Sequence, residues 1–146
     1  MKKFAFPLHR VLDWRDTLAQ VEEAKLERMY GELRALESSE AALRAERERS
    51  ERAVAQAPSA EGFELAALDA FRRFAVAEHT RLEERRADCA KRIAAQIQVV
   101  AQKRCDVRLL QHLKDKRWAA WNRGVAREIE TQAGETYLAK WQRGAL

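Results

Sequence analysis

The last 45 residues of this chain hold all of its unbalanced charge. Residues 102–146 contain ten Lys or Arg against five Asp or Glu, whereas residues 1–57 carry eleven of each and residues 58–101 carry seven of each. Three of the four Trp residues lie in the same basic segment. A basic, Trp-bearing tip on an otherwise neutral chain indicates a part that inserts into a partner or lies against one.

Catalytic and metal-binding groups show no such clustering in the sequence. There is no Gly-rich phosphate loop, no HExxH or CxxC motif, and no Ser/His/Asp arrangement beyond chance. His9, His79 and His112 are widely dispersed. Because a rod of two helices also lacks a concave pocket that would desolvate reacting groups, we expect no enzymatic activity, no catalytic residue, no cofactor and no metal site.

The composition predicts an all-α protein. Charged residues make up 35% of the chain and hydrophobic residues 47%, with only five Gly and two Pro among 146 residues. The apolar residues are mostly Ala and Leu, and no stretch alternates with the period of a β-strand. We expect a single domain of long helices.

Two further features bear on compartment and cysteine chemistry. No run approaches the roughly 18 apolar residues of a membrane span, and residues 1–10 do not have the pattern of a signal peptide, so we expect a cytoplasmic protein.

Cys89 and Cys105 would lie about 24 Å apart on one helix, too far for a disulfide. We expect both to be packing residues.

One strong break divides the chain. Pro58, Ser59 and Gly62 lie within five residues and combine a helix-ending Pro, a possible capping Ser and a Gly. Apolar stripes at 3-4 spacing run on both sides, although Glu40 and Arg47 interrupt the first stripe. The expected fold is a long antiparallel coiled-coil hairpin, with helices over about 8–57 and 63–142 and a turn over 58–62.

The position of the turn sets the register between the helices. Residue i of the first helix should lie opposite about residue 119 − i of the second, so the second helix outruns the first from about His112 onward. This overhang has no expected partner within the chain, yet it keeps an apolar face made of Trp118, Trp121, Val125 and Ile129. Either a partner orders it, or it folds back or associates with itself.

Apolar residues also gather just after the turn, at Phe63, Leu68, Phe71 and Phe74. Helical spacing allows about half of them to face the first helix. Phe71 or Phe74 should therefore be partly exposed, as a packing residue or as an anchor for docking.

The first residues carry a recognisable pattern. Phe4-x-Phe6-x-Leu8-x-x-Val11-Leu12-x-x-Arg15, followed by a long helix rich in Glu, Arg, Ala and Leu, resembles the opening of the FliJ family of flagellar type III export proteins. The length and the hairpin layout are also similar. The family is similar in turn to the stalk proteins of virulence type III secretion and to the gamma subunit of F-type ATPases.

The resemblance implies a non-enzymatic stalk at the cytoplasmic face of the inner membrane. Its partners would be a hexameric export ATPase, a membrane export-gate protein and export chaperones. The terminal end would enter the ATPase ring and promote its assembly and activity. The candidate residues for ATPase contact are Arg10, Arg15, Lys114, Lys116, Arg117, Trp118, Trp121, Arg123 and Arg127. The candidates for export-gate contact are Leu68, Phe71, Phe74 and His79.

Three alternatives remain open from sequence. The chain could be the stalk of a virulence secretion system. A basic helix with Trp could bind nucleic acid, although acidic residues alternate with the basic ones and no stacking platform accompanies them. The same helix could lie on an anionic membrane surface. We expect no nucleic-acid partner, and only peripheral association with the membrane complex.

Overall fold

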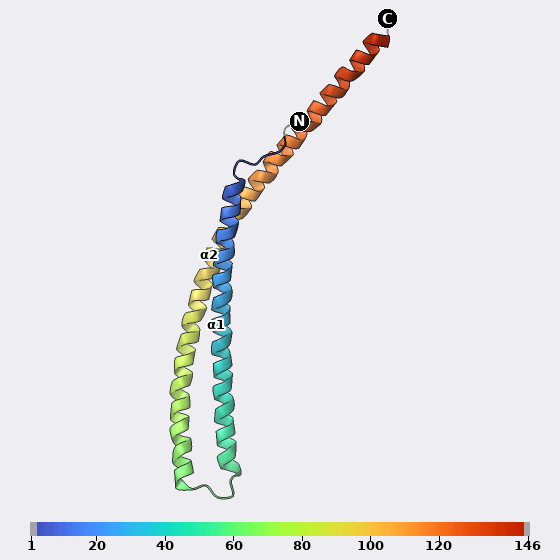
Figure 1. The fold of residues 1–146 in the computed structure, drawn as a ribbon. Coiled ribbons are helices and arrows are strands. Elements are labelled where there is room, and N and C mark those ends of the chain that lie inside the picture. Colours follow the sequence, from blue (N-terminus) through green and yellow to red (C-terminus); the bar gives the residue numbers. More distant parts are fainter. Residues whose placement is uncertain (1–2, 145–146) are drawn as a thin grey trace. The chain divides into compact units, whose positions relative to one another are not determined.

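A computed structural model describes residues 3–144, which form two long helices and contain no strand. Helix α1 spans His9–Gln56 and helix α2 spans Gly62–Gly144 (Figure 1). Of residues 3–144, 92% are helical, and the two helices pack against each other. The predicted all-α helical hairpin is therefore confirmed, with both helix limits within two residues of those expected.

Each helix contributes to two compact units. The terminal unit comprises Met1–Ala19 and Gln102–Leu146, and the hairpin unit comprises Gln20–Ala101. The terminal unit has fourteen basic and seven acidic residues, a formal charge of +7, whereas the hairpin unit has fourteen basic and sixteen acidic residues, a charge of −2. The charge asymmetry seen in the sequence thus follows the division between the units.

The linker between the helices covers residues 57–61. Pro58 disfavours helical geometry at Ala57 and so ends α1. At the start of α2, the carboxylate of Glu64 accepts a 3.0 Å hydrogen bond from the backbone N–H of Glu61. This is the returning half of a capping box. Ser59, which we expected as a possible cap, lies in the linker three residues before Gly62, the first residue of α2.

The hairpin unit is held by a seam with heptad spacing. On α2, Ala75, Leu82 and Cys89 are buried at intervals of seven residues. The predicted register holds: the Cys89 thiol lies 3.5 Å from the Met29 carbonyl oxygen, and the Gln96 side-chain amide donates to the Glu22 carbonyl oxygen at 3.0 Å. Heptad spacing keeps the same face of each helix toward the other along the whole unit.

Ion pairs between the helices flank this seam. Glu51 accepts hydrogen bonds from Arg47 on its own helix and from Arg72 on α2, and these hold the pKa of Glu51 below its usual value. Arg92 donates to Glu32 across the seam at 2.6 Å, which raises the pKa of Arg92. Such exposed pairs contribute little each, so the apolar seam supplies most of the stability.

In the terminal unit, Phe6, Leu12 and Ala19 are buried against α2. Two arginine–aspartate pairs join the helices: Arg15 with Asp106 at 3.3 Å, and Arg104 with Asp16 at 2.8 Å. Cys105 is exposed, so the expectation that both cysteines are packing residues is wrong for this one. Cys105 lies on a face of α2 that the first helix does not cover, whereas Cys89 is in the seam.

The overhang starts later than predicted. The expectation that α2 has no partner from His112 onward is wrong, because the ring of Phe4 lies 5.9 Å from that of Trp121 and the Arg117 guanidinium lies 5.9 Å from the Phe6 ring. Residues 3–6 are not helical. An extended chain advances about 3.3 Å per residue against about 1.5 Å in a helix, so this short segment covers α2 for several further turns.

Candidate functional site

The predicted ATPase-contact residues divide into two groups in the terminal unit. Lys116, Arg123 and Arg127 are exposed on α2, and Arg10 is exposed on α1. Within residues 3–144 none of these four forms an ion pair. They are therefore free to meet a partner's carboxylates.

The remaining predicted contacts are at least partly used inside the chain. Arg15 pairs with Asp106 and also lies 5.1 Å from the Trp14 ring. Arg117 lies over Phe6 and Trp121 against Phe4, while Lys114 is half-buried. Trp118 is 51% exposed. Arg15, Arg117 and Trp121 thus fix the first residues onto α2 as well as lining the surface.

Residues 122–144 form a segment in which α2 runs without a partner among the residues that the structure describes; we call it the single-helix segment. At about 1.5 Å per residue it is about 34 Å long. Val125 is half-buried, and every other residue of the segment is exposed. A Cβ added at Gly124 or Gly134 would meet no atom within 4 Å, so packing within the chain requires glycine at neither position. Each glycine costs the helix about 1 kcal/mol relative to Ala.

The apolar face of the single-helix segment continues beyond the residues found in the sequence. Val125, Ile129, Ala133, Tyr137 and Trp141 follow one another at intervals of four, which places them along one ridge of the helix. Ile129, Tyr137 and Trp141 are 50%, 70% and 66% exposed. Ile129 was the last residue of the predicted apolar face, but the spacing of four continues in the sequence and extends the ridge to Trp141.

The predicted export-gate residues lie in the hairpin unit near the linker. Phe74 is 55% exposed and its ring lies 6.2 Å from that of Phe71, which is half-buried like Leu68. Phe63 is 78% exposed. Two of the four residues, Leu68 and Phe71, are half-buried, and Phe63 and Phe74 are the exposed members of the cluster.

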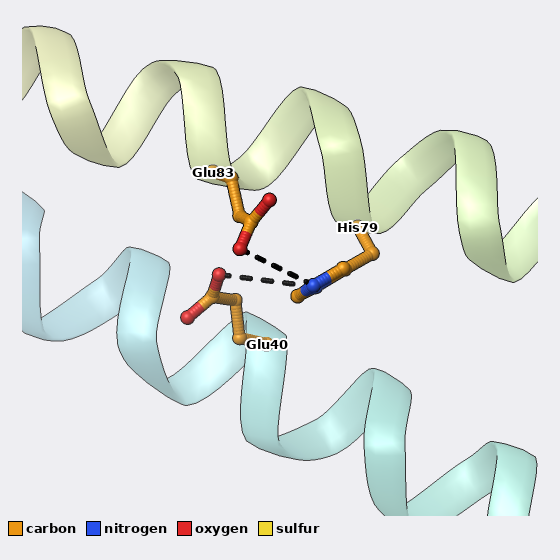
Figure 2. Close-up of side chains that lie close together, drawn as sticks. All are labelled: Glu40, His79 and Glu83. Atoms are coloured by element: carbon orange, nitrogen blue, oxygen red, sulfur yellow. Dashed lines mark ion pairs between the residues drawn. The ribbon is translucent and has the colours of Figure 1, made fainter.

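His79, the last of the predicted export-gate residues, lies between the carboxylates of Glu40 and Glu83. Its Nε2 atom is 3.4 Å from Glu83 one turn along α2, and its Nδ1 atom is 4.0 Å from Glu40 on α1. Figure 2 shows the three side chains converging from the two helices. One ligand atom from each residue lies within 4.8 Å of those of the other two. Spacing along one segment does not predict this cluster, because Glu40 comes from the opposite helix.

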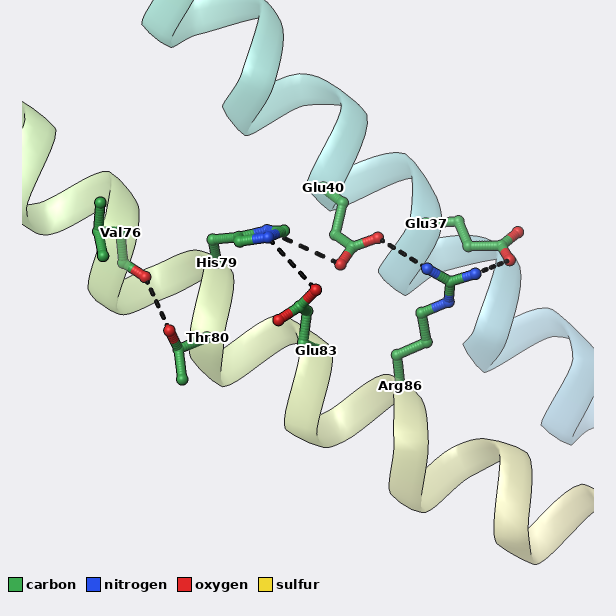
Figure 3. Close-up of polar contacts among 7 residues, drawn as sticks. All are labelled: Glu37, Glu40, Val76, His79, Thr80, Glu83 and Arg86. Atoms are coloured by element: carbon green, nitrogen blue, oxygen red, sulfur yellow. Dashed lines mark hydrogen bonds and ion pairs between the residues drawn. The ribbon is translucent and has the colours of Figure 1, made fainter.

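A second layer of charges surrounds the cluster. The other oxygen of Glu40 lies 3.5 Å from Arg86, whose guanidinium also lies 3.8 Å from Glu37 (Figure 3). Thr80, the next residue after His79, donates its hydroxyl to the Val76 carbonyl oxygen at 3.1 Å. A half-open groove of about 200 Å³ lies beside the cluster and is lined in part by Glu40, His79 and Thr80.

Comparison with known proteins adds no assignment. No family model matches the chain, and the searches of curated proteins and of solved structures gave no match. Within residues 3–144, neither helix has a stretch apolar and long enough to cross a membrane.

Proposed function

We propose that this chain is a non-enzymatic stalk of a type III protein export apparatus. Its terminal unit enters the ring of the export ATPase, and its hairpin unit contacts the membrane export gate through Phe74 and its neighbours. The chain also binds export chaperones at the cytoplasmic face of the membrane. The flagellar system is preferred over a virulence system because the opening residues resemble the FliJ family.

The single-helix segment is the observation that carries this proposal. A helix of about 34 Å with an exposed apolar ridge, glycines at two interior positions and no partner among residues 3–144 is expected to be ordered by another molecule. One helix is about 10–12 Å across, which fits the central pore of a ring ATPase. The unpaired Arg123 and Arg127 would meet carboxylates lining that pore.

The charge pattern of the single-helix segment also weighs against the two alternative partners. It carries four basic residues and three acidic ones, Glu128, Glu130 and Glu135. Nucleic acid and anionic lipid would both repel these carboxylates, whereas a protein surface can pair with charges of either sign. A protein partner therefore suits this segment better than a phosphate-rich one.

The test measures ATP hydrolysis by the purified export ATPase from the same source, titrated with the full chain. We expect a saturable rise in activity together with a shift of the ATPase toward the ring, because the stalk binds the assembled form preferentially. Parallel assays with anionic vesicles and with duplex DNA provide the comparison. Unchanged ATPase activity and ring assembly, with binding to vesicles or DNA at physiological salt, would overturn the proposal.

A further inference from the structure

We propose that Glu40, His79 and Glu83 form a binding site for a divalent transition-metal ion such as Zn²⁺. The three side chains come from both helices of the hairpin unit and point toward one space (Figure 2). The inference does not depend on the proposed ATPase contact, since none of these residues lies in the terminal unit.

The spacing of the ligand atoms suits a metal after small side-chain movements. Three atoms that lie within 4.8 Å of one another have a common point no more than about 2.8 Å from each. Zn²⁺ binds histidine nitrogen and carboxylate oxygen at about 2.0–2.2 Å, so each ligand needs to move by less than about 1 Å. His79 and Glu83 are separated by four residues, which places them one above the other on the same face of α2.

Glu40 holds the position that makes this cluster unusual for a coiled coil. It follows Leu12, Ala19, Leu26 and Leu33 at intervals of seven residues, so it occupies a seam position where an apolar residue is expected. Its side chain is only 11% exposed. A carboxylate placed there loses much of its hydration and is stabilised only if cationic groups compensate it.

The charges around Glu40 leave room for a divalent cation. Arg86 contacts one carboxylate oxygen of Glu40 and is itself shared with Glu37, while the other oxygen faces His79 (Figure 3). With neutral His79, the carboxylates of Glu37, Glu40 and Glu83 and the guanidinium of Arg86 sum to −2. Of the two arginines that line the adjacent groove, Arg47 pairs with Glu51, and including Arg44 leaves the sum at −1, so the site still favours a cation. Arg86 would then orient the Glu40 carboxylate, as partners behind a metal ligand commonly do.

The types of ligand indicate the class of ion. Mg²⁺ and Ca²⁺ prefer oxygen ligands alone, whereas an imidazole beside carboxylates suits zinc and its first-row neighbours. His79 and Glu83 are 49% and 61% exposed, so water can complete the coordination. A bound ion would join α1 to α2 within the hairpin unit and stabilise their pairing.

The experiment uses the full chain without an affinity tag, titrated with Zn²⁺ in a buffer that does not chelate metals. Calorimetry should give one ion per chain at this site, and Co²⁺ should give the absorption bands of a bound ion. His79→Gln and Glu83→Gln should each weaken binding by at least about tenfold, since loss of a mere outer partner already costs about 10–100-fold. Zn²⁺ should also raise the melting temperature of the parent chain.

The chain offers matched controls. His9 lies 3.3 Å from Asp13 at the same spacing of four, and that pair lies in the other unit, on α1 alone. His9→Gln should leave Zn²⁺ affinity unchanged, as should Cys105→Ser, which removes the exposed thiol. Absence of binding at millimolar Zn²⁺ would overturn the site. So would affinity that survives both cluster variants, or that depends on His9 or Cys105 instead.

Discussion

Reversing Lys116, Arg123 and Arg127 to Glu is expected to raise the concentration of chain needed for half-maximal ATPase stimulation by at least about tenfold. All three residues are exposed and form no ion pair within residues 3–144, so their charges are available to a partner. Contacts of about 0.5 kcal/mol each would together amount to about 1.5 kcal/mol, or roughly tenfold in affinity. Raising the salt concentration should reduce the difference from the parent chain, because exposed charges are screened.

The matched control reverses three exposed basic residues of the hairpin unit, Arg28, Arg44 and Arg85, which gives the same change in net charge. This variant should stimulate the ATPase like the parent chain. Helix content, measured by circular dichroism, checks that both variants remain folded. If both variants lost ATPase stimulation equally, net charge alone would explain the effect. If the variant of Lys116, Arg123 and Arg127 lost no stimulation, these residues would not belong to the interface.

Replacing Leu82 with Ala is expected to lower the free energy of unfolding by about 2–4 kcal/mol. Leu82 is only 5% exposed and lies beside Leu36 in the seam of the hairpin unit. A seam of two helices has few other buried residues to compensate for the loss. Urea denaturation followed by circular dichroism should show the change as a lower midpoint.

Leu65→Ala is the matched control, because Leu65 lies on the same helix but is 51% exposed. Leu65→Ala should change the free energy of unfolding by no more than about 0.5 kcal/mol. If the two variants had the same midpoint, the seam around Leu82 would not be what holds α1 against α2.

The helix limits and the register could be predicted because the sequence has one strong break and regular apolar spacing. The rule that residue i faces about 119 − i places Leu43 opposite residue 76 and Leu36 opposite residue 83. Leu43 indeed borders a groove with Ala75 and Val76, and Leu36 one with Leu82. The rule failed at the N-terminal end because it assumes helical rise, whereas residues 3–6 are not helical and Phe4 reaches Trp121.

The excess of basic residues in the terminal unit could be predicted from the sequence. Which of these residues contact other parts of the same chain could not. The roles of Arg15 and Arg117 depend on partners that are distant in the sequence: Arg15 pairs with Asp106, and Arg117 lies over the ring of Phe6. The cluster around His79 was within reach of the same register, since 119 − 79 is 40. It was overlooked because motif searches follow spacing along one segment, whereas Glu40 comes from the opposite helix.

The most direct measurement places a photoactivatable cross-linker at position 127, and in a second variant at position 74, and maps the products formed with the export ATPase. Position 127 lies in the single-helix segment and position 74 in the exposed apolar cluster near the linker. The proposed stalk predicts cross-links from position 127 to residues that line the pore of the ATPase ring, and none there from position 74. Pore cross-links from position 74, or products from position 127 only on the outer surface of the ring, would contradict it.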